Sequence, residues 1–217
     1  MKRAHCGIIV IICWSGLASA GTSPQKAPAS FWDTPVVNYP GNPSQEMWAF
    51  CHDLDMPCGI EMVNCEELDS TNLVLRLDKT TARNALSQML KRHPGYHYTF
   101  RDSVFNFKPS ARKHQDPLSE RLPQLSIHGS SSSLAARDVI HQSGIQLAHV
   151  MSEDKASEFA TISLKLKDVT VREALNAIAK ADGHAAWVFC VNRDGAQARF
   201  WIVSYRRSMP SRTGGPP

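Results

Sequence analysis

Two distant stretches of the chain carry the same pattern of hydrophobic and polar positions. Each begins with residues that alternate with a period of two, which is typical of a strand with one buried face. The alternating apolar positions are Leu73, Leu75 and Leu77 in the first stretch and Ile162, Leu164 and Leu166 in the second. We therefore predict a strand at the start of each stretch.

An amphipathic helix is predicted directly after each of these strands. From Ala82 and again from Val171, apolar residues recur at i, i+3, i+4, i+7 and i+8, which places them in one stripe. Thr81 and Thr170 are the predicted N-cap residues, and Glu173 completes a capping box with Thr170.

A hairpin of two strands is predicted to close each stretch. The helices end at the stop signals HPG (93–95) and DG (182–183). The predicted hairpin strands are 96–100 and 104–107 in the first stretch, and 184–191 and 199–205 in the second, with a turn at 192–195.

The two stretches align residue by residue with an offset of 89 positions. Eight of the 26 aligned pairs from Leu75/Leu164 to Phe100/Phe189 are identical, where ordinary composition would give about two by chance. The identical pairs are Leu75/Leu164, Leu77/Leu166, Thr81/Thr170, Arg83/Arg172, Ala85/Ala174, Leu86/Leu175, Lys91/Lys180 and Phe100/Phe189. The chain therefore contains an internal repeat.

The repeat extends upstream, where each copy adds a strand, a helix and a second strand. Gly59 and Gly144 are predicted to mark the exits from these helices, and GSSSS (129–133) is predicted to end in a helix cap. The expected fold is α+β, with two tandem β-α-β-β-α-β-β modules that each pack two helices against small mixed sheets. The predicted segments are a signal peptide (1–20), a flexible segment (21–33), the first module (34–108), a linker (109–123), the second module (124–205) and a disordered tail (206–217).

The first twenty residues have the form of a cleaved signal peptide. Lys2 and Arg3 precede the apolar run Gly7–Leu17, and Ala18–Ala20 has the small-x-small form of a cleavage site. The apolar run is about eleven residues long, shorter than the roughly twenty needed to cross a bilayer. We predict cleavage after Ala20, a periplasmic or secreted location and no membrane span after cleavage. A retained anchor is the alternative.

Composition argues against nucleic acid as a partner. Of the 24 basic residues, two leave with the leader, so that 22 remain against 20 acidic residues. A charge balance this close to neutral does not favour binding to nucleic acid or to an anionic membrane surface.

Four cysteines remain after cleavage, and an even count in an exported chain permits disulfides. If 59–63 is a strand, Cys58 and Cys65 lie roughly 20 Å apart, too far to form a bond. The disulfide candidate is Cys51 with Cys58, because a short loop separates them. Buried free thiols are the alternative.

The residues show no pattern of a catalytic, metal or cofactor site. The chain lacks the G-x-S-x-G and C-x-x-C motifs, and Pro94 and Gly95 break the helix that would align His93 with His97. We expect no enzymatic activity, no metal and no cofactor.

The module resembles the short N-terminal domain of secretins and TonB-dependent receptors. The resemblance rests on LSIHGSSSSLAARDVIHQSGIQLAHV (125–150) and ISLKLKDVTVREALNAIAKADG (162–183), and it covers nearly the whole mature chain in two copies. It implies two helices between a two-stranded and a three-stranded sheet, no catalytic residues, and docking to envelope proteins. The implied partner is an envelope protein or peptide, within a secretin or TonB-type assembly.

The candidate partner surface is one face of the last predicted strand. Trp201, Val203 and Tyr205 share this face, whereas Phe200 and Ile202 share the opposite face. The alternative is that Trp201 covers a helix layer. Open strand edges can also accept a strand from a partner.

Two other function classes stay open from the sequence. A small ligand or substrate would bind in a cleft between the modules, lined by Trp187, His184 or His97. A metal or redox carrier would be built on Cys51, Cys58 and Cys65.

Overall fold

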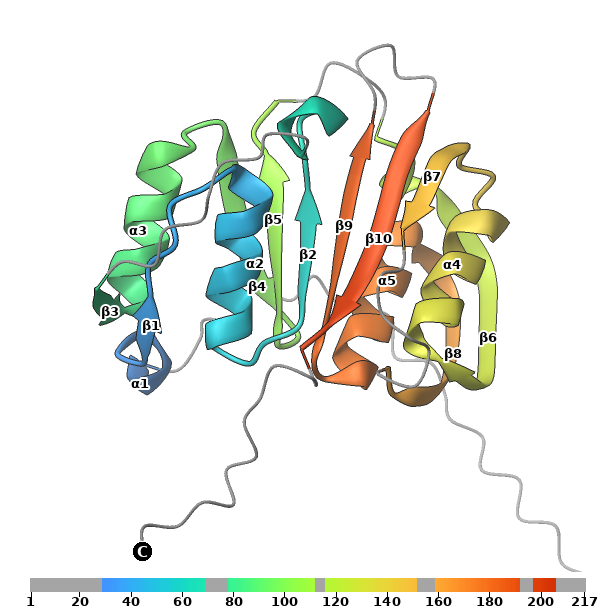
Figure 1. Ribbon diagram of the computed structural model, residues 1–217. Coiled ribbons are helices and arrows are strands. Elements are labelled where there is room, and N and C mark those ends of the chain that lie inside the picture. The colour runs from blue at the N-terminus through green and yellow to red at the C-terminus, as the bar shows by residue number, and fades with distance from the viewer. Residues whose placement is uncertain (1–28, 69–77, 112–115, 152–158, 192–196, 206–217) are drawn as a thin grey trace, which may run out of the picture.

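The computed structural model describes residues 29–68, 78–111, 116–151, 159–191 and 197–205, which form five α-helices and ten strands (Figure 1). The first half contains α1 (Ala29–Trp32), β1 (Pro35–Val37), α2 (Pro43–Asp53), β2 (Cys58–Glu61), the 3-10 helix η1 (Cys65–Leu68), β3 (Lys79–Thr81), α3 (Ala82–Arg92), β4 (Tyr96–Arg101) and β5 (Val104–Pro109). The second half contains the 3-10 helix η2 (Pro117–Ser119), β6 (Arg121–Ser131), α4 (Ser132–Gln142), β7 (Leu147–Met151), β8 (Thr161–Thr170), α5 (Val171–Asp182), β9 (Ala185–Val191) and β10 (Ala198–Ser204). The predicted α+β class is confirmed, and the order β-α-β-β-α-β-β occurs twice.

The two modules share one six-stranded sheet, in the order β4-β5-β2-β9-β10-β7. In each module an antiparallel hairpin is joined by a third strand that runs parallel to its neighbour: β4–β5 with β2, and β9–β10 with β7. The parallel pair β2–β9 joins the modules. The remaining strands form two separate antiparallel pairs, β1–β3 and β6–β8.

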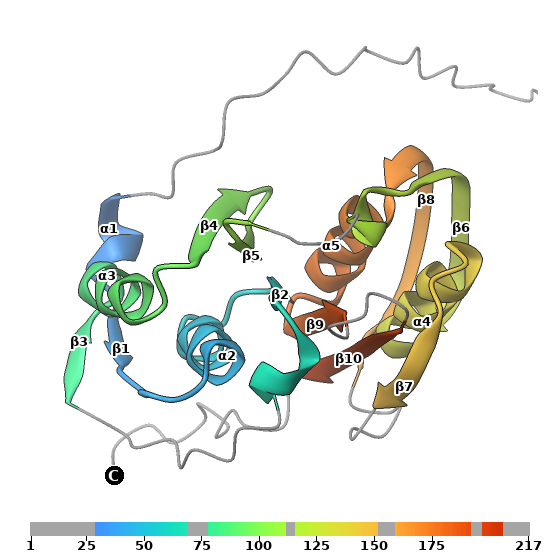
Figure 2. The same cartoon turned by 90° about the horizontal axis from the view of Figure 1, so that it is seen from above.

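The helices of the two modules lie on opposite faces of this sheet (Figure 2). Strand order is the same in both modules, but β9 runs parallel to β2 whereas its counterpart β4 runs antiparallel to β5 and β2. The second module is therefore turned over relative to the first. As a result β9 is buried on both faces, which explains why 185–191 is a continuous apolar run rather than an alternating one.

The helix ends agree with the capping residues predicted from the sequence. Thr170 Oγ1 accepts a hydrogen bond from Glu173 N at 3.2 Å, and Thr170 N donates to Glu173 Oε2 at 2.8 Å, which completes the capping box. Thr81 Oγ1 accepts from Asn84 N at 3.3 Å. Gly183 ends α5 with a left-handed φ of 83°.

Two segment boundaries differ from the prediction. The segment 21–33, predicted to be flexible, contains α1, and its Trp32 is 9% exposed. The segment 109–123, predicted to be a linker, contains η2 and the start of β6, and Leu118 within it is fully buried. Both segments differ from the prediction because each one packs a short helix against a long helix of its module. In the first module α1 packs against α3, and in the second η2 packs against α5.

Several predictions lie outside the described residues. These are the signal peptide, the strand positions Leu73, Leu75 and Leu77, the turn at 192–195 and the tail 206–217. Among the helices that the structure describes, none has the length and apolar character needed to cross a membrane.

Candidate interaction surface

The two modules join where β2 adds to the edge of β9. The strands run parallel, with Gly59 opposite Trp187 and Glu61 opposite Phe189. The backbone N–H of Met62 continues the ladder by donating to the carbonyl of Phe189 at 2.9 Å. The second module therefore already holds an added strand at this edge.

Gly59 is positioned against the indole of Trp187. The Trp187 ring is fully buried, and its Nε1 donates to Asn176 Oδ1 at 3.1 Å, which fixes its orientation. A Cβ atom on Gly59 would lie 2.1 Å from Trp187 Cζ2. The prediction that Gly59 marks the helix exit was wrong, because α2 ends at Asp53 with Leu54 as its C-cap, and the positive φ of 54° belongs to Asp55.

An ion-pair network lies beside this contact. Arg172 Nε lies 2.5 Å from Glu61 Oε1 and its Nη2 lies 3.0 Å from Oε2, so the pair is bidentate. Arg172 Nη2 also contacts Asp116 Oδ2 at 2.6 Å. The Glu61 side chain is 1% exposed. Burial and the nearby Arg172 cation lower the pKa of Lys108.

A disulfide also ties the modules together. Cys65 and Cys190 are bonded, with their Cα atoms 5.2 Å apart and a sequence separation of 125. The bond forms because β2 and β9 are neighbours, which brings the residues after β2 next to the end of β9. Sequence spacing alone gave no signal for this pair.

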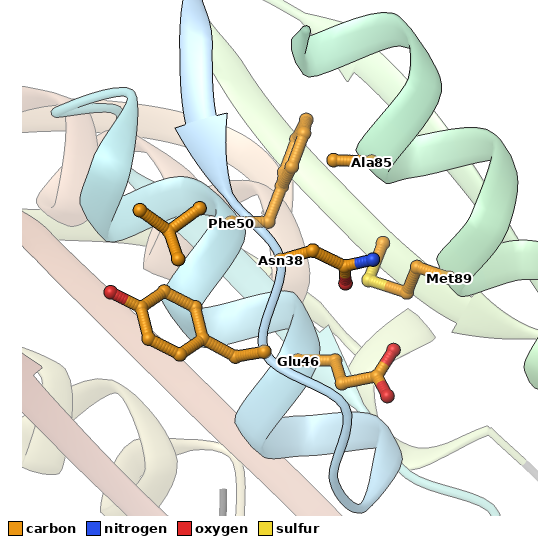
Figure 3. A pocket seen from close by; sticks show the side chains of 7 residues that line it. Asn38, Glu46, Phe50, Ala85 and Met89 are labelled. Atoms are coloured by element: carbon orange, nitrogen blue, oxygen red, sulfur yellow. The ribbon is translucent and has the colours of Figure 1, made fainter. Parts of the chain in front are cut away.

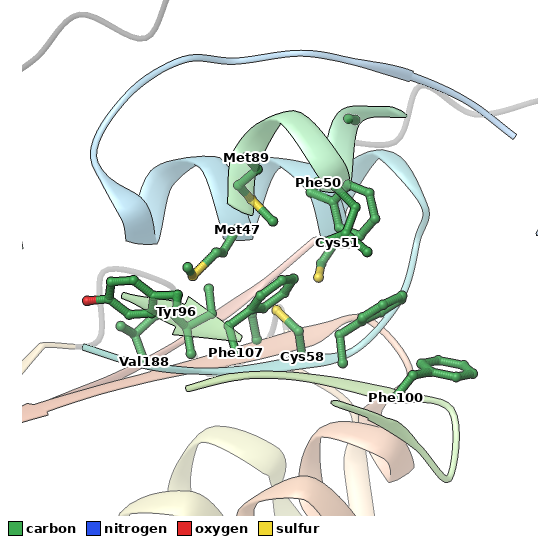
Figure 4. Packing of buried hydrophobic residues seen from close by; sticks show 14 of the residues in the cluster. Met47, Phe50, Cys51, Cys58, Met89, Tyr96, Phe100, Phe107 and Val188 are labelled. Carbon is green, nitrogen blue, oxygen red and sulfur yellow. The ribbon is translucent and has the colours of Figure 1, made fainter. Parts of the chain in front are cut away.

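The predicted disulfide between Cys51 and Cys58 is not present in the structure. Both residues are buried free cysteines whose side chains approach each other in the core of the first module (Figure 4). Burial raises the pKa of Cys51, and the hydrogen bond with Cys58 raises it further. Cys58 Sγ lies 3.3 Å from the hydroxyl of Tyr205. With Cys65 bonded to Cys190, the three cysteines proposed for a carrier do not form one site.

The face of β10 that was predicted to bind a partner packs against the first module. Tyr205 is fully buried, and its ring contacts Trp48 and His52 of α2 at centroid distances of 5.8 and 5.3 Å. Trp201 and Val203 are half-buried against the same core. Tyr205 is therefore not a surface residue. The reason is that the turned-over second module presents this face to α2.

The three residues proposed to line a cleft between modules do not come together. Trp187 is buried in the junction, and His184 Nδ1 contacts Asp55 Oδ1 at 2.6 Å. His97 is exposed on β4, which β5 and β2 separate from β9 in the sheet.

A small pocket in the first module is lined by Asn38, Glu46, Phe50, Ala85 and Met89, together with Val37 and Tyr39 (Figure 3). Its volume of about 10 Å³ has room for no more than one water molecule. Glu46 at its wall is paired with Arg92 at 2.9 Å and with His93 at 3.4 Å. Burial alone would raise the pKa of Glu46, but hydrogen bonds from His93, Arg92 and Gly41 outweigh it and lower the pKa.

A more open hollow of about 450 Å³ lies between His93 and Tyr96. The Tyr96 hydroxyl donates to Glu67 Oε2 at 2.6 Å and accepts from Val63 N at 3.0 Å. Burial and the Glu67 carboxylate raise the pKa of Tyr96, so the phenol stays protonated. These polar groups satisfy one another, as expected for structural hydrogen bonds.

The two ends of the six-stranded sheet are β4 and β7. Within the described residues β4 pairs only with β5, and its side chains His97, Thr99 and Arg101 are exposed. Val63 and Leu134 are the exposed large hydrophobic residues of the described chain, and they lie on different modules. These two residues do not form one apolar patch. The exposed side chains of β4 make the outward side of this strand (Tyr96–Arg101) the candidate interaction surface, which is called the β4 edge below.

In comparisons with known proteins, no family, no curated protein and no solved structure matches this chain. The family resemblance stays a prediction from the residues, and the β4 edge is the feature from which a function is argued.

Proposed function

We propose that the protein is a non-enzymatic docking protein of the cell envelope that binds a partner protein or peptide at the β4 edge. The observation that carries the proposal is the equivalence of β4 and β9. These strands occupy the same place in their modules, and the edge of β9 holds the added strand β2. Strand addition supplies main-chain hydrogen bonds to an edge that would otherwise offer unpaired backbone groups to solvent.

Export to the periplasm or beyond is part of the proposal. Its support is the leader-like sequence 1–20 together with the Cys65–Cys190 bond, since disulfides persist in oxidising compartments. The resemblance to the short domain of secretins and TonB-dependent receptors suggests an accessory role in a secretion or uptake assembly.

Site-specific cross-linking tests the proposal. A photo-cross-linking amino acid is placed at Thr99, an exposed residue of β4, or at Ser126, an exposed residue of β6, and each protein is irradiated in envelope extract. We expect an adduct from Thr99 but not from Ser126. The protein identified by mass spectrometry should then bind the purified chain, with weaker binding when Thr99 and Arg101 are both changed to Glu. No adduct at Thr99, or the same adduct from both positions, would contradict docking at this edge.

A further inference from the structure

The second module shows which chemistry its strand-accepting edge recognises. In the strand β2, Gly59 lies beneath the ring of Trp187, and Glu61 is held by the guanidinium of Arg172. Two elements therefore recognise β2. The Trp187 ring leaves room only for a small residue at position 59, and Arg172 binds the carboxylate at position 61, two residues further along β2. Both lie on the face of the sheet that the helices of the second module cover.

The first module carries both elements at equivalent positions. With the offset of 89 residues, Trp187 corresponds to Tyr98, and Arg172 corresponds to the identical Arg83. Tyr98 is half-buried, and its ring lies 6.4 Å from that of Trp32. The guanidinium of Arg83 stacks 5.7 Å above the same Trp32 ring. In the first module, the aromatic ring and the arginine thus both lie against the ring of Trp32.

The backbone of β4 is oriented to accept a strand. The carbonyl of Gly95 accepts from Ser110 N at 2.7 Å, so the antiparallel alternation directs the backbone groups of Tyr96, Tyr98 and Phe100 away from β5. Phe100 corresponds to Phe189, whose carbonyl accepts from Met62 N in the occupied edge. The outward groups thus stand in the same register in both modules.

The charge around Arg83 differs from that around Arg172. Arg172 is shared between Glu61 and Asp116. Within the described chain, Arg83 is exposed and has no ion pair to a carboxylate. A carboxylate from outside the molecule would complete its coordination.

We propose that the β4 edge binds an extended peptide segment of the form small residue–x–acidic residue, parallel to β4. The small residue lies beneath Tyr98, and the carboxylate binds Arg83. This inference rests on the proposed docking function and specifies the class of partner segment.

The occupant is a different protein rather than a second copy of this chain. A second copy of this chain would offer the strand β7, which ends the six-stranded sheet and is the counterpart of β2 in the second module. The sequence of β7, LAHVM, contains no acidic residue. The face of β9 that packs under α2 carries Ala186, Val188 and Cys190. The corresponding residues of β4 are His97, Thr99 and Arg101, which are polar or cationic and favour an acidic partner over an apolar one.

Peptide binding to the purified mature chain tests the inference. A fluorescent peptide copies residues 57–62 with Cys58→Ser, and its binding is followed by fluorescence anisotropy. We expect saturable binding that weakens about tenfold or more when the peptide carries Glu61→Gln or Gly59→Val, since a charge-assisted bidentate pair and a steric fit are each lost. Arg83→Gln in the protein should weaken binding by a similar factor. Arg137→Gln, which changes an exposed arginine of α4, should leave it unchanged.

Each other outcome overturns the inference. Absence of saturable binding, or equal affinity for all peptides, removes the small–x–acidic rule. Binding that is insensitive to Arg83→Gln means that the peptide displaces β2 from β9 instead. If Thr99 still cross-links a partner in these cases, docking at the β4 edge stands and only the recognition rule falls.

Discussion

The indole of Trp187 lies directly over Gly59, its partner in the parallel pair β2–β9, and the two residues come from different copies of the repeat. The contact is close because a glycine leaves the space that a Cβ would fill. Trp187 is thereby buried in the core of its own module while it seals the junction to the other module. The junction depends on this fit.

Replacement of Gly59 by alanine should destabilise the protein. The new Cβ would lie 2.1 Å from Trp187 Cζ2, and the buried, hydrogen-bonded indole has little room to move. Overpacking of this kind typically costs about 1 to 3 kcal/mol, and we expect the upper end. Urea unfolding measures the loss. Gly95→Ala is the matched control, because nothing lies within 4 Å of a Cβ at that position. Equal stability of the two variants would contradict the account.

Removal of Arg172 should cost more than removal of Arg172 and Glu61 together. Arg172→Met leaves the buried Glu61 carboxylate without its guanidinium, and breaking a buried pair in this way typically costs about 3 to 5 kcal/mol. In the double variant with Glu61→Met, no fully buried carboxylate remains and two apolar side chains pack, while Asp116, which also loses Arg172, keeps 29% of its side chain exposed to solvent. We expect the double variant to regain at least half of the loss in urea unfolding. Additive losses would show that the pair is not coupled.

The Cys65–Cys190 bond should contribute strongly to stability, since it closes a long loop. With a sequence separation of 125 between the cysteines, the chain-entropy model gives roughly 5 kcal/mol as an upper estimate. The Cys65→Ser, Cys190→Ser variant should therefore unfold at clearly lower urea. Thiol titration of the denatured, unreduced chain 21–217 should find two reactive thiols, those of Cys51 and Cys58. No reactive thiols would indicate a second disulfide between these two, and four would show that the Cys65–Cys190 bond is absent.

The sequence was sufficient to predict the long helices and the hairpins of each module but not how the modules join. Periodicity and caps are local signals, so the helix that begins after Thr170 and ends at Gly183 could be placed without a structure. Pairing of β2 with β9 is a contact between distant segments, and no local pattern encodes it. For the same reason Tyr205 was predicted to be on the surface, although α2 of the other module covers it. The acidic Glu61 at the end of β2, a strand whose other residues carry no charge, is a sequence feature that could have pointed to the junction.

Acidification should weaken the fold through Glu46. Hydrogen bonds from His93, Arg92 and Gly41 lower the pKa of this carboxyl below its ordinary value of 4.5, despite the opposing effect of burial. A depressed folded pKa means that the ionised carboxylate stabilises the fold above pH 4.5, and that this contribution is lost as the pH falls through the folded pKa. Glu46→Gln should therefore cost about 1 to 3 kcal/mol at pH 7 and much less at pH 3, as measured by urea unfolding at both pH values. Glu120→Gln, which changes an exposed carboxylate, serves as the control for the loss of a surface charge. A Glu46→Gln deficit that stays constant from pH 7 to pH 3 would show that the carboxylate charge does not contribute to stability.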